Sequence, residues 1–398
     1  MDLKITPGKF TGNISVIPSK SQAHRLLICA AFADKPTVLH CPDTNRDIEA
    51  TATCLNALGA DIRRTESCYT VRPVVEPARK ASLPCRDSGS TLRFLLPVAG
   101  ALGVNADFQL EGRLAQRPLS PLWEEMERMG CKLSYSKPNV LHCEGQLRSG
   151  EYCIDGSVSS QFVSGLLFAA ALIPGENKIT ITGKVESRPY IDLTRNAMEI
   201  FGRSSRDFSV TGGSPFISPK TLAVEGDWSN GAFFLAANAL GNDLTVSNLS
   251  ESSLQGDRAA AELLVNLKEH CVISAADIPD LVPILSVAAA CHQGAVFTNI
   301  QRLRLKESDR VASVIAMIRS LGGQAEATDD TLTVYGTGLT GGIVDCVNDH
   351  RIAMSAAIVA TVCTKPVMLL GAQCVAKSYP HFFEEYRRLG GNYEQYIR

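Results

Sequence analysis

The sequence lacks a strong excess of charge of either sign. Its 398 residues carry a formal net charge of −2, whereas a protein that binds nucleic acid through a broad basic surface needs a clear positive excess. No basic segment followed by an apolar stretch opens the chain, so we expect no signal peptide. The apolar stretches, such as 162–174, are too short and too interrupted to span a bilayer. We therefore expect a cytoplasmic protein with no nucleic-acid or membrane partner.

Metal and cofactor motifs are missing as well. The 13 cysteines form no Cys-x-x-Cys pair, so zinc-type spacing is absent and a secreted disulfide framework is not indicated. We interpret them as ordinary thiols in a reducing cytosol. The chain also has no glycine-lysine phosphate loop, no dinucleotide fingerprint and no tight acidic cluster suited to Mg²⁺. We expect neither a metal nor a cofactor.

The sequence does contain a sixfold repeat, whose first component is an amphipathic helix ending in an apolar residue and a glycine. Glycine suits the left-handed conformation that ends many helices. Copies occupy 52–59, 122–130, 193–202, 311–322 and 382–390, and a weaker copy at 260–268 lacks the glycine.

The second component is an apolar helix with a polar N-terminus. Because these helices are apolar on nearly all sides, we expect them to be buried. Strand-like stretches follow several of them, for example 178–182 and 244–246. A single core rarely grows past about 250–300 residues, so the pattern predicts two lobes of three α/β units each. The six helices begin near Ser21, Ser90, Ser160, Ser229, Asp280 and Asp349, the last two of which we expect to head their helices.

The N-termini of the buried helices are the candidate binding sites. Free N–H groups and the helix dipole favour anions there. Serines, lysines and arginines recur at these positions and in the equivalent loops. Each alone is explained by helix capping or by solvated charge. Together they predict an enzyme that closes a cleft of lysines and arginines over two small, multiply anionic substrates without a metal.

Eight motifs resemble those of the enolpyruvyl transferases, and in particular those of the EPSP synthase family. They occur in the same order as in that family. They extend over essentially the whole chain. The motifs are Ser19-Lys20-Ser21-x-x-x-Arg25, Asp87-Ser88-Gly89-Ser90-x-x-Arg93, Gln116-Arg117-Pro118, Asp155-Gly156-Ser157-x-Ser159-Ser160-Gln161, Arg188-Pro189-Tyr190-Ile191-Asp192, Lys306-Glu307-Ser308-Asp309-Arg310, Asn348-Asp349-His350-Arg351 and Lys377-Ser378-Tyr379-Pro380.

The resemblance implies an α/β (α+β) fold of two lobes, each with three βαβαββ repeats around buried helices, described as an inside-out α/β barrel. A double crossover would join the lobes near Pro18 and Ser19 and near 225–227. One domain would comprise 1–18 and 227–398, and the other, which binds shikimate 3-phosphate, would comprise 19–226. We expect a monomer.

The resemblance also implies a reaction of the shikimate pathway to chorismate and the aromatic amino acids. The enolpyruvyl group of phosphoenolpyruvate would pass to the 5-hydroxyl of shikimate 3-phosphate through a tetrahedral intermediate, with release of phosphate. Asp280 would deprotonate the hydroxyl, Glu307 would protonate the methylene carbon, and Lys20 would be the third catalytic residue. Phosphoenolpyruvate would be bound by Lys20, Gly89, Arg117, Gln161, Arg310, Arg351 and Lys377. Shikimate 3-phosphate would be bound by Lys20, Ser21, Arg25, Ser159, Ser160, Gln161, Ser187, Asp280 and Lys306.

Some positions depart from the family pattern. Ser88 and Phe94 flank the position that the family inhibitor glyphosate occupies, so sensitivity to glyphosate stays open. Arg302 stands where the family often has an asparagine that contacts the phosphate of shikimate 3-phosphate, so this contact stays open as well. The residues that replace a usual Asn or Thr are His24, Asp87, Ser90 and Arg302.

Two alternatives remain open. A UDP-N-acetylglucosamine enolpyruvyl transferase shares the fold but needs a cysteine in the mobile loop that here reads Leu114-Ala115-Gln116. A noncatalytic, ring-like nucleic-acid-binding repeat protein needs diffuse basic charge, which this chain lacks.

Overall fold

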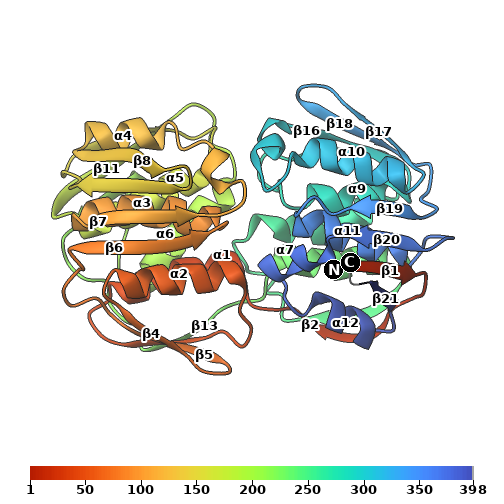
Figure 1. Cartoon of the computed structure of the whole chain (residues 1–398), viewed down its shortest axis with the longest axis horizontal. Coiled ribbons are helices and arrows are strands. Elements are labelled where there is room, and N and C mark those ends of the chain that lie inside the picture. The colour runs from red at the N-terminus through yellow and green to blue at the C-terminus, as the bar shows by residue number, and fades with distance from the viewer. Residues whose placement is uncertain (397–398) are drawn as a thin grey trace. The chain divides into compact units, whose positions relative to one another are not determined.

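The computed structural model describes residues 1–396 and divides the chain into two compact units. Unit 1 comprises Met1–Ile17 and Gly226–Arg398, and unit 2 comprises Pro18–Glu225 (Figure 1). The chain therefore passes from one unit to the other twice. Each unit has its own hydrophobic core.

One repeat of unit 2 shows the βαβαββ order in full. Its sheet has the strand order β6-β7-β9-β8, in which β6 and β7 are parallel and the other neighbours are antiparallel. In chain order the elements are β6 (Lys80–Arg86), α3 (Gly89–Leu102), β7 (Asn105–Leu110), α4 (Leu122–Arg128), β8 (Cys131–Lys137) and β9 (Val140–Gly145).

The other two repeats of unit 2 have the same plan. One sheet has the order β13-β3-β5-β4 and the other the order β10-β11-β12, and each begins with a parallel pair. The first repeat consists of α1 (Lys20–Ala31), β3 (Thr37–His40), α2 (Arg46–Ala57), β4 (Asp61–Arg64), β5 (Cys68–Arg72) and β13 (Thr221–Ala223). The second consists of β10 (Glu151–Asp155), α5 (Ser160–Leu172), β11 (Gly175–Thr182), α6 (Arg188–Ile200) and β12 (Ser209–Gly212).

Unit 1 repeats this plan with the sheets β15-β16-β18-β17, β19-β20-β1-β21 and β14-β2. The first contains β15 (Cys271–Ser274), α9 (Val282–Ala290), β16 (Gly294–Thr298), α10 (Arg310–Ser320), β17 (Gln324–Ala327) and β18 (Thr331–Tyr335). The second contains β19 (Gly342–Asp345), α11 (His350–Ala360), β20 (Val367–Leu370), α12 (Phe382–Arg388), β21 (Asn392–Tyr396) and β1 (Asp2–Thr6). The third contains β2 (Thr11–Ser15), α7 (Trp228–Ala239), β14 (Asp243–Ser247) and α8 (Ala260–Asn266).

The two crossings of the chain follow from which strands pair. Strand β2 lies parallel to β14, although all of unit 2 separates them in the sequence. Strand β13, at the far end of unit 2, lies parallel to β3 near its beginning. Unit 2 thus completes one sheet with a strand distant in sequence, and unit 1 completes two, because β1 also pairs with β20 and β21. Across residues 1–396 every sheet is hydrogen-bonded separately, and none closes into a barrel.

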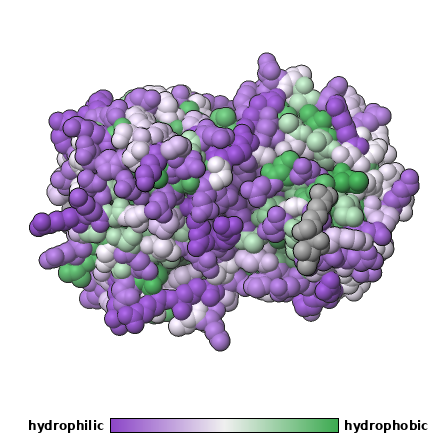
Figure 2. Space-filling view, in the orientation of Figure 1, coloured by the Kyte–Doolittle hydropathy of each residue, from purple (hydrophilic) through white to green (hydrophobic). Residues whose placement is uncertain are grey.

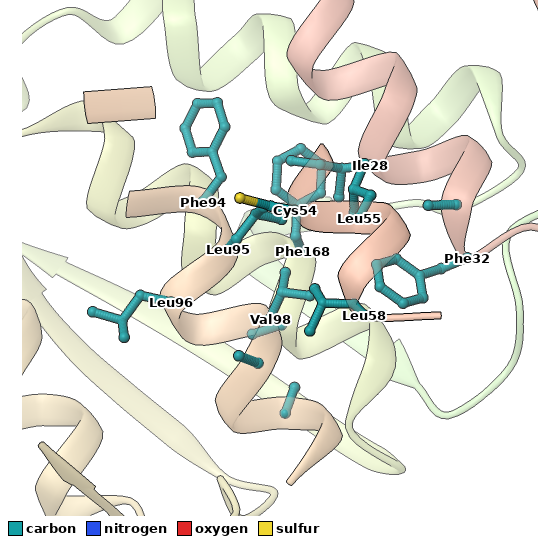
Figure 3. Packing of buried hydrophobic residues seen from close by; sticks show 14 of the residues in the cluster. Ile28, Phe32, Cys54, Leu55, Leu58, Phe94, Leu95, Leu96, Val98 and Phe168 are labelled. Carbon is teal, nitrogen blue, oxygen red and sulfur yellow. The ribbon is translucent and has the colours of Figure 1, made fainter. Parts of the chain in front are cut away.

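The apolar helices are buried, as predicted. In unit 1, α7, α9 and α11 contact one another, and every residue of α9 and α11 is buried. In unit 2, side chains of α1, α2, α3 and α5 interlock, among them Ile28, Leu55, Phe94 and Phe168 (Figure 3). The visible surface is mostly hydrophilic, with smaller apolar areas (Figure 2). No helix in the described part of the chain has the length and apolar character needed to cross a bilayer.

The amphipathic helices end where glycine was expected. Gly202 after α6 and Gly322 after α10 have φ values of 70° and 90°. This left-handed conformation strains residues that carry a Cβ atom. The repeat signal therefore located both the helices and their ends.

Candidate active site

Most buried helices begin at a residue whose side chain accepts a hydrogen bond from the first turn. The exception is α9, which begins at Val282 with Pro283 in its first turn. The expectation that Asp280 heads this helix is wrong by two residues, because the helix starts at Val282 and has Pro283, which lacks an N–H group, in the first turn, where no intrahelical donor is needed. Asp280 stays in the preceding loop, where its carboxylate is free of a capping role. The five N-caps are Ser19, Ser88, Ser159, Asp227 and Asp349.

In unit 1, Arg310 lies at the centre of a network of carboxylates. It is the first residue of α10, and its side chain is only 1% exposed. Its guanidinium donates to Asp280 Oδ1 at 2.5 Å, to Glu307 Oε2 at 2.8 Å and to Asp349 Oδ2 at 2.9 Å. Burial opposes its charge, but the three carboxylates raise the pKa of Arg310 well above its usual value. One rigid cation therefore holds three acidic groups.

Asp280 receives two further cations. Lys306 Nζ lies 3.7 Å from Asp280 Oδ1, and Arg351 Nη2 lies 3.6 Å from Asp280 Oδ2. Burial would raise the pKa of this carboxyl, but Lys306, Arg310 and Arg351 together hold it well below its usual range. Asp280 is therefore ionised at neutral pH, and its side chain, 30% exposed, can be reached by a ligand.

Two lysines complete this set. Lys377 Nζ lies 3.7 Å from Glu307 Oε1, so Glu307 has cations on both oxygens. Burial lowers the pKa of Lys306 to about 8, against the opposing charge of Asp280 and with the help of Arg302. The charge of Lys306 therefore varies in the mildly alkaline range.

Arg351 connects α11 to the N-terminus of α7. Its Nη1 donates to the Ser229 carbonyl at 3.0 Å, and its buried Nε has no hydrogen-bond partner. The Ser229 hydroxyl donates to Asp257, which is fully buried. Burial and the charge of Asp280 raise the pKa of Asp257 to about 6, although Arg351 opposes the shift. A buried donor without a partner is a candidate for binding an anion.

The loop that leads into α11 is strained. Val347 and Asn348 have φ values of 45° and 54°, and Arg86, which precedes the N-terminus of α3 in unit 2, has a φ value of 53°. Positive φ in a β-branched residue is rare, and such strain costs on the order of 1–3 kcal/mol. Strain that the surrounding structure maintains is typical of ligand-binding segments.

In unit 2, Lys20 is held by a carboxylate that the sequence did not reveal. Lys20 is the first residue of α1, and its Nζ lies 3.1 Å from Asp47 Oδ2 on α2. Asp47 is almost fully buried, and its other oxygen has no hydrogen-bond partner. The pair fixes the position of the Lys20 ammonium.

Two guanidinium groups lie against the backbone of Gly89, the first residue of α3. A Cβ atom at Gly89 would lie 2.6 Å from Arg93 Nη1 and 2.7 Å from Arg117 Nη1. Arg93 also donates to Gln161 Oε1 at 3.4 Å and to the Pro118 carbonyl at 3.2 Å. The structure thus brings Gly89, Arg117 and Gln161 together through Arg93, a residue to which the sequence assigned no role.

Arg25 is almost fully buried, with 3% of its surface exposed. Its Nε donates to Thr194 Oγ1 at 2.7 Å, its Nη1 to the Ser21 carbonyl at 2.5 Å and its Nη2 to the Tyr190 carbonyl at 2.8 Å. Its guanidinium also lies over the ring of Phe94, 4.9 Å from the centroid. Burial lowers the pKa of Arg25 to about 9. Arg25 therefore links α1 to α6 through these hydrogen bonds, in addition to any role in binding a substrate.

The serines expected to bind shikimate 3-phosphate include three at helix N-termini. Ser159 caps α5 by accepting from the Gln161 amide at 3.3 Å, and Ser160 is the first residue of that helix. Ser187 precedes α6 in a left-handed conformation with φ 54°. Capping uses only the oxygen of Ser159, so its hydroxyl hydrogen can still be donated.

The predicted residues thus form two sets, one in each unit. The sequence analysis gave no role to three residues that hold them, namely Asp47, Arg93 and Asp257. Arg93 carried a signal, since it lies one helical turn after Gly89, whereas Asp47 and Asp257 bond residues 27 and 28 positions away. Unit 1 contains Asp280, Lys306, Glu307, Arg310, Arg351 and Lys377, and unit 2 contains Lys20, Ser21, Arg25, Gly89, Arg117, Ser159, Ser160, Gln161 and Ser187. Within residues 1–396, no group of three His, Cys, Asp or Glu side chains could hold a metal ion.

Comparisons with known proteins agree over nearly the full length of the chain. The family model of EPSP synthase (3-phosphoshikimate 1-carboxyvinyltransferase) matches residues 5–386. The 3-phosphoshikimate 1-carboxyvinyltransferase of Clostridium botulinum (strain Alaska E43) is 37% identical, with 99% of this chain and 98% of that protein covered. That of Clostridium kluyveri is also 37% identical, with the same coverage. The solved EPSP synthase of Acinetobacter baumannii has a TM-score of 0.80 at 23% identity, covering 99% of this chain and 100% of that one.

Two units of three α/β repeats around buried helices match the fold of the solved EPSP synthase. The chain belongs to the EPSP synthase family and is a transferase that acts on small molecules. The predicted fold class, family and enzyme class are therefore confirmed. The UDP-N-acetylglucosamine enzyme is not favoured, and a noncatalytic nucleic-acid-binding protein has no support.

Proposed function

We propose that this enzyme transfers the enolpyruvyl group of phosphoenolpyruvate to the 5-hydroxyl of shikimate 3-phosphate and releases phosphate. The observation that carries the proposal is the shared guanidinium of Arg310, which holds Asp280 and Glu307 beside two lysines. The reaction needs one group that accepts a hydroxyl proton and one that gives a proton to carbon. Two fixed carboxylates within a cationic cluster suit both steps.

The cations match the charge of the substrates. Each substrate carries a carboxylate and a phosphate of about −1.5 to −2. Arginine suits both groups because its planar fork donates two parallel hydrogen bonds. In this proposal, phosphoenolpyruvate is held by Lys20, Gly89, Arg117, Gln161, Arg310, Arg351 and Lys377. Shikimate 3-phosphate is held by Lys20, Ser21, Arg25, Ser159, Ser160, Gln161, Ser187, Asp280 and Lys306.

Asp280 takes the proton of the 5-hydroxyl. Without substrate, Lys306, Arg310 and Arg351 depress its pKa and leave it a weak base. An anionic substrate that draws Lys306 and Arg351 towards itself weakens their hold on the carboxylate. The pKa of Asp280 then rises towards the range in which a general base is effective. Substrate binding and activation of the base are coupled through the same cations.

Glu307, in its protonated form, gives a proton to the methylene carbon of phosphoenolpyruvate. Positive charge then develops at the adjacent carbon, where the 5-oxygen of shikimate 3-phosphate forms the new C–O bond. The tetrahedral intermediate then returns a proton from its methyl group to Glu307 and expels phosphate, which takes up the proton held by Asp280, and the double bond is restored. Lys20, held by Asp47, neutralises the departing phosphate, and the fixed carboxylates stabilise the developing positive charge.

The choice of acceptor tests this function. The enzyme is mixed with phosphoenolpyruvate and either shikimate 3-phosphate or UDP-N-acetylglucosamine, and both phosphate and the enolpyruvyl product are measured. We expect one phosphate per enolpyruvyl shikimate 3-phosphate and none with the nucleotide sugar. Phosphate with UDP-N-acetylglucosamine but not with shikimate 3-phosphate would refute the proposal.

The proposal extends to a monomeric, cytoplasmic enzyme that needs no cofactor. Each unit has a hydrophobic core of its own, which supports a chain that folds without a partner. Light scattering should give the mass of one chain, and a concentration-dependent dimer mass would refute this part.

A further inference from the structure

Four buried polar side chains link the N-terminal halves of three helices of unit 2. His24 Nδ1 lies 2.7 Å from Thr51 Oγ1, and Thr51 Oγ1 lies 2.7 Å from Thr91 Oγ1. The Thr91 hydroxyl donates to Ser88 Oγ at 2.8 Å. These residues belong to α1, α2 and α3 with its N-cap, and all four have 0% exposure. Burying such a polar chain is costly unless its members satisfy one another, so it needs an explanation.

The direction of the chain follows from its hydrogens. Each threonine has one hydroxyl hydrogen to donate. Because Thr91 donates to Ser88, it accepts from Thr51, and Thr51 in turn accepts from His24 Nδ1. His24 therefore carries its proton on Nδ1, and Nε2, which has no hydrogen-bond partner, is the unprotonated nitrogen. Burial and two neighbouring cations hold the pKa of His24 well below its usual value, so the ring stays neutral.

Both ends of the chain lie beside groups assigned to phosphoenolpyruvate. At one end, Ser88 Oγ accepts from the Thr91 amide at 3.3 Å and so closes the first turn of α3, which begins at Gly89. The other end is His24 on α1, the helix that begins at Lys20. The Thr91 hydroxyl also lies 3.4 Å from the carbonyl of Asp47, whose carboxylate holds Lys20.

We propose that His24, Thr51, Thr91 and Ser88 form a positioning relay, which keeps the first turn of α3 at a fixed position relative to the N-terminus of α1. The inference rests on the proposed function, in which Gly89 and Lys20 bind the same substrate. The relay touches no substrate and acts by holding these two groups at a fixed separation. Affinity for phosphoenolpyruvate therefore depends on the hydroxyl of Thr51.

Substitutions on α2 test the relay. Thr51→Val keeps the branched shape and removes the hydroxyl, whereas Thr51→Ser keeps the hydroxyl. Thr53→Val is the matched control, because Thr53 is exposed on the same helix and donates to the Glu49 carbonyl. Breaking a buried hydrogen-bond chain leaves unsatisfied groups, so Thr51→Val should raise the KM for phosphoenolpyruvate about tenfold. Its kcat and its KM for shikimate 3-phosphate should change less than about twofold, and the other two variants should resemble the wild type.

Two further measurements do not depend on activity. Amide hydrogen exchange in peptides that contain Ser88 to Thr91 should be faster in Thr51→Val and unchanged in Thr51→Ser. The ring ¹⁵N signals of His24 in the wild type can be assigned by their loss in His24→Gln. They should show a proton on Nδ1. This measurement tests the relay even if Thr51→Val does not fold.

The relay is overturned if Thr51→Val and Thr51→Ser behave alike, if exchange in α3 is unchanged, or if His24 carries its proton on Nε2. Faster exchange with an unchanged KM for phosphoenolpyruvate also overturns it. If the wild type releases no phosphate with shikimate 3-phosphate, the proposed function fails instead. The exchange rates and the His24 signals then decide the relay without it.

Discussion

Arg310 Nη1 donates to Asp280 Oδ1 at 2.5 Å, so the carboxylate proposed as the base is held by a cation that is itself almost fully buried. The same guanidinium binds Asp349, which has no exposed surface. Removing one partner of a buried ion pair leaves the other charge uncompensated. Arg310 therefore has two roles, because it positions Asp280 and it stabilises unit 1.

Arg310→Ala should lower the free energy of unfolding by about 3 kcal/mol or more, because Asp349 stays buried without its cation. The control is Arg304→Ala, which removes an exposed pair 3.7 Å from Asp309 and should cost less than about 1 kcal/mol. Urea denaturation measures both values. Equal losses in the two variants would contradict a structural role for Arg310.

Binding of shikimate 3-phosphate should weaken above about pH 8. The pKa of Lys306 is about 8, so its ammonium loses a proton as the pH rises through that value and no longer attracts an anion. The KM for shikimate 3-phosphate should rise about tenfold between pH 7.5 and pH 9.5. In Lys306→Arg the charge at this position persists, so this KM should rise less than in the wild type, and the remaining rise comes from Arg25, whose pKa is about 9. Lys178→Arg, at an exposed position, should keep the wild-type profile, and a rise as steep in Lys306→Arg would rule Lys306 out.

Asp257→Asn should stabilise the protein at neutral pH. The pKa of Asp257 is about 6 in the folded state and about 3.9 when unfolded, so the folded state favours the protonated form. The stability that this group contributes is complete below about pH 4 and is lost as the pH rises through about 6. At pH 7 the ionised carboxylate costs about 3 kcal/mol, which asparagine avoids while it still accepts from Ser229. Thermal unfolding should show a gain at pH 7 that is absent at pH 4, whereas an equal gain at both values would argue against a titrating Asp257.

The helices could be predicted because each repeat carries its own local signal. The apolar run beginning at Ser160 became α5, and the glycine-ended pattern before Gly322 became α10. No local sequence signal indicated which strands pair with each other. Strands β2 and β14 are neighbours only because the chain leaves unit 1 and returns, and no local pattern encodes that register.

The cations of the candidate site could also be predicted, but the pairing of Arg310 with Asp349 and of Lys20 with Asp47 could not. Arg310 and Lys20 were visible as basic residues at helix N-termini. Their partners Asp349 and Asp47 lie 39 and 27 positions away, and only folding brings them within hydrogen-bond distance. Asp280 was assigned from the family resemblance but was wrongly placed at the head of a helix. Its loop position matters chemically, because a capping carboxylate would have been occupied by backbone amides.

The measurement that most directly tests the account is turnover and binding by Asp280→Asn. Asparagine keeps the size and one accepting oxygen of the side chain but cannot take the hydroxyl proton. The account predicts that both substrates still bind within a few-fold of the wild type by calorimetry, while kcat for phosphate release falls by about 10²–10⁴-fold. Asp277→Asn, at an exposed position on the same loop, should turn over normally. Normal phosphate release by Asp280→Asn would contradict the account.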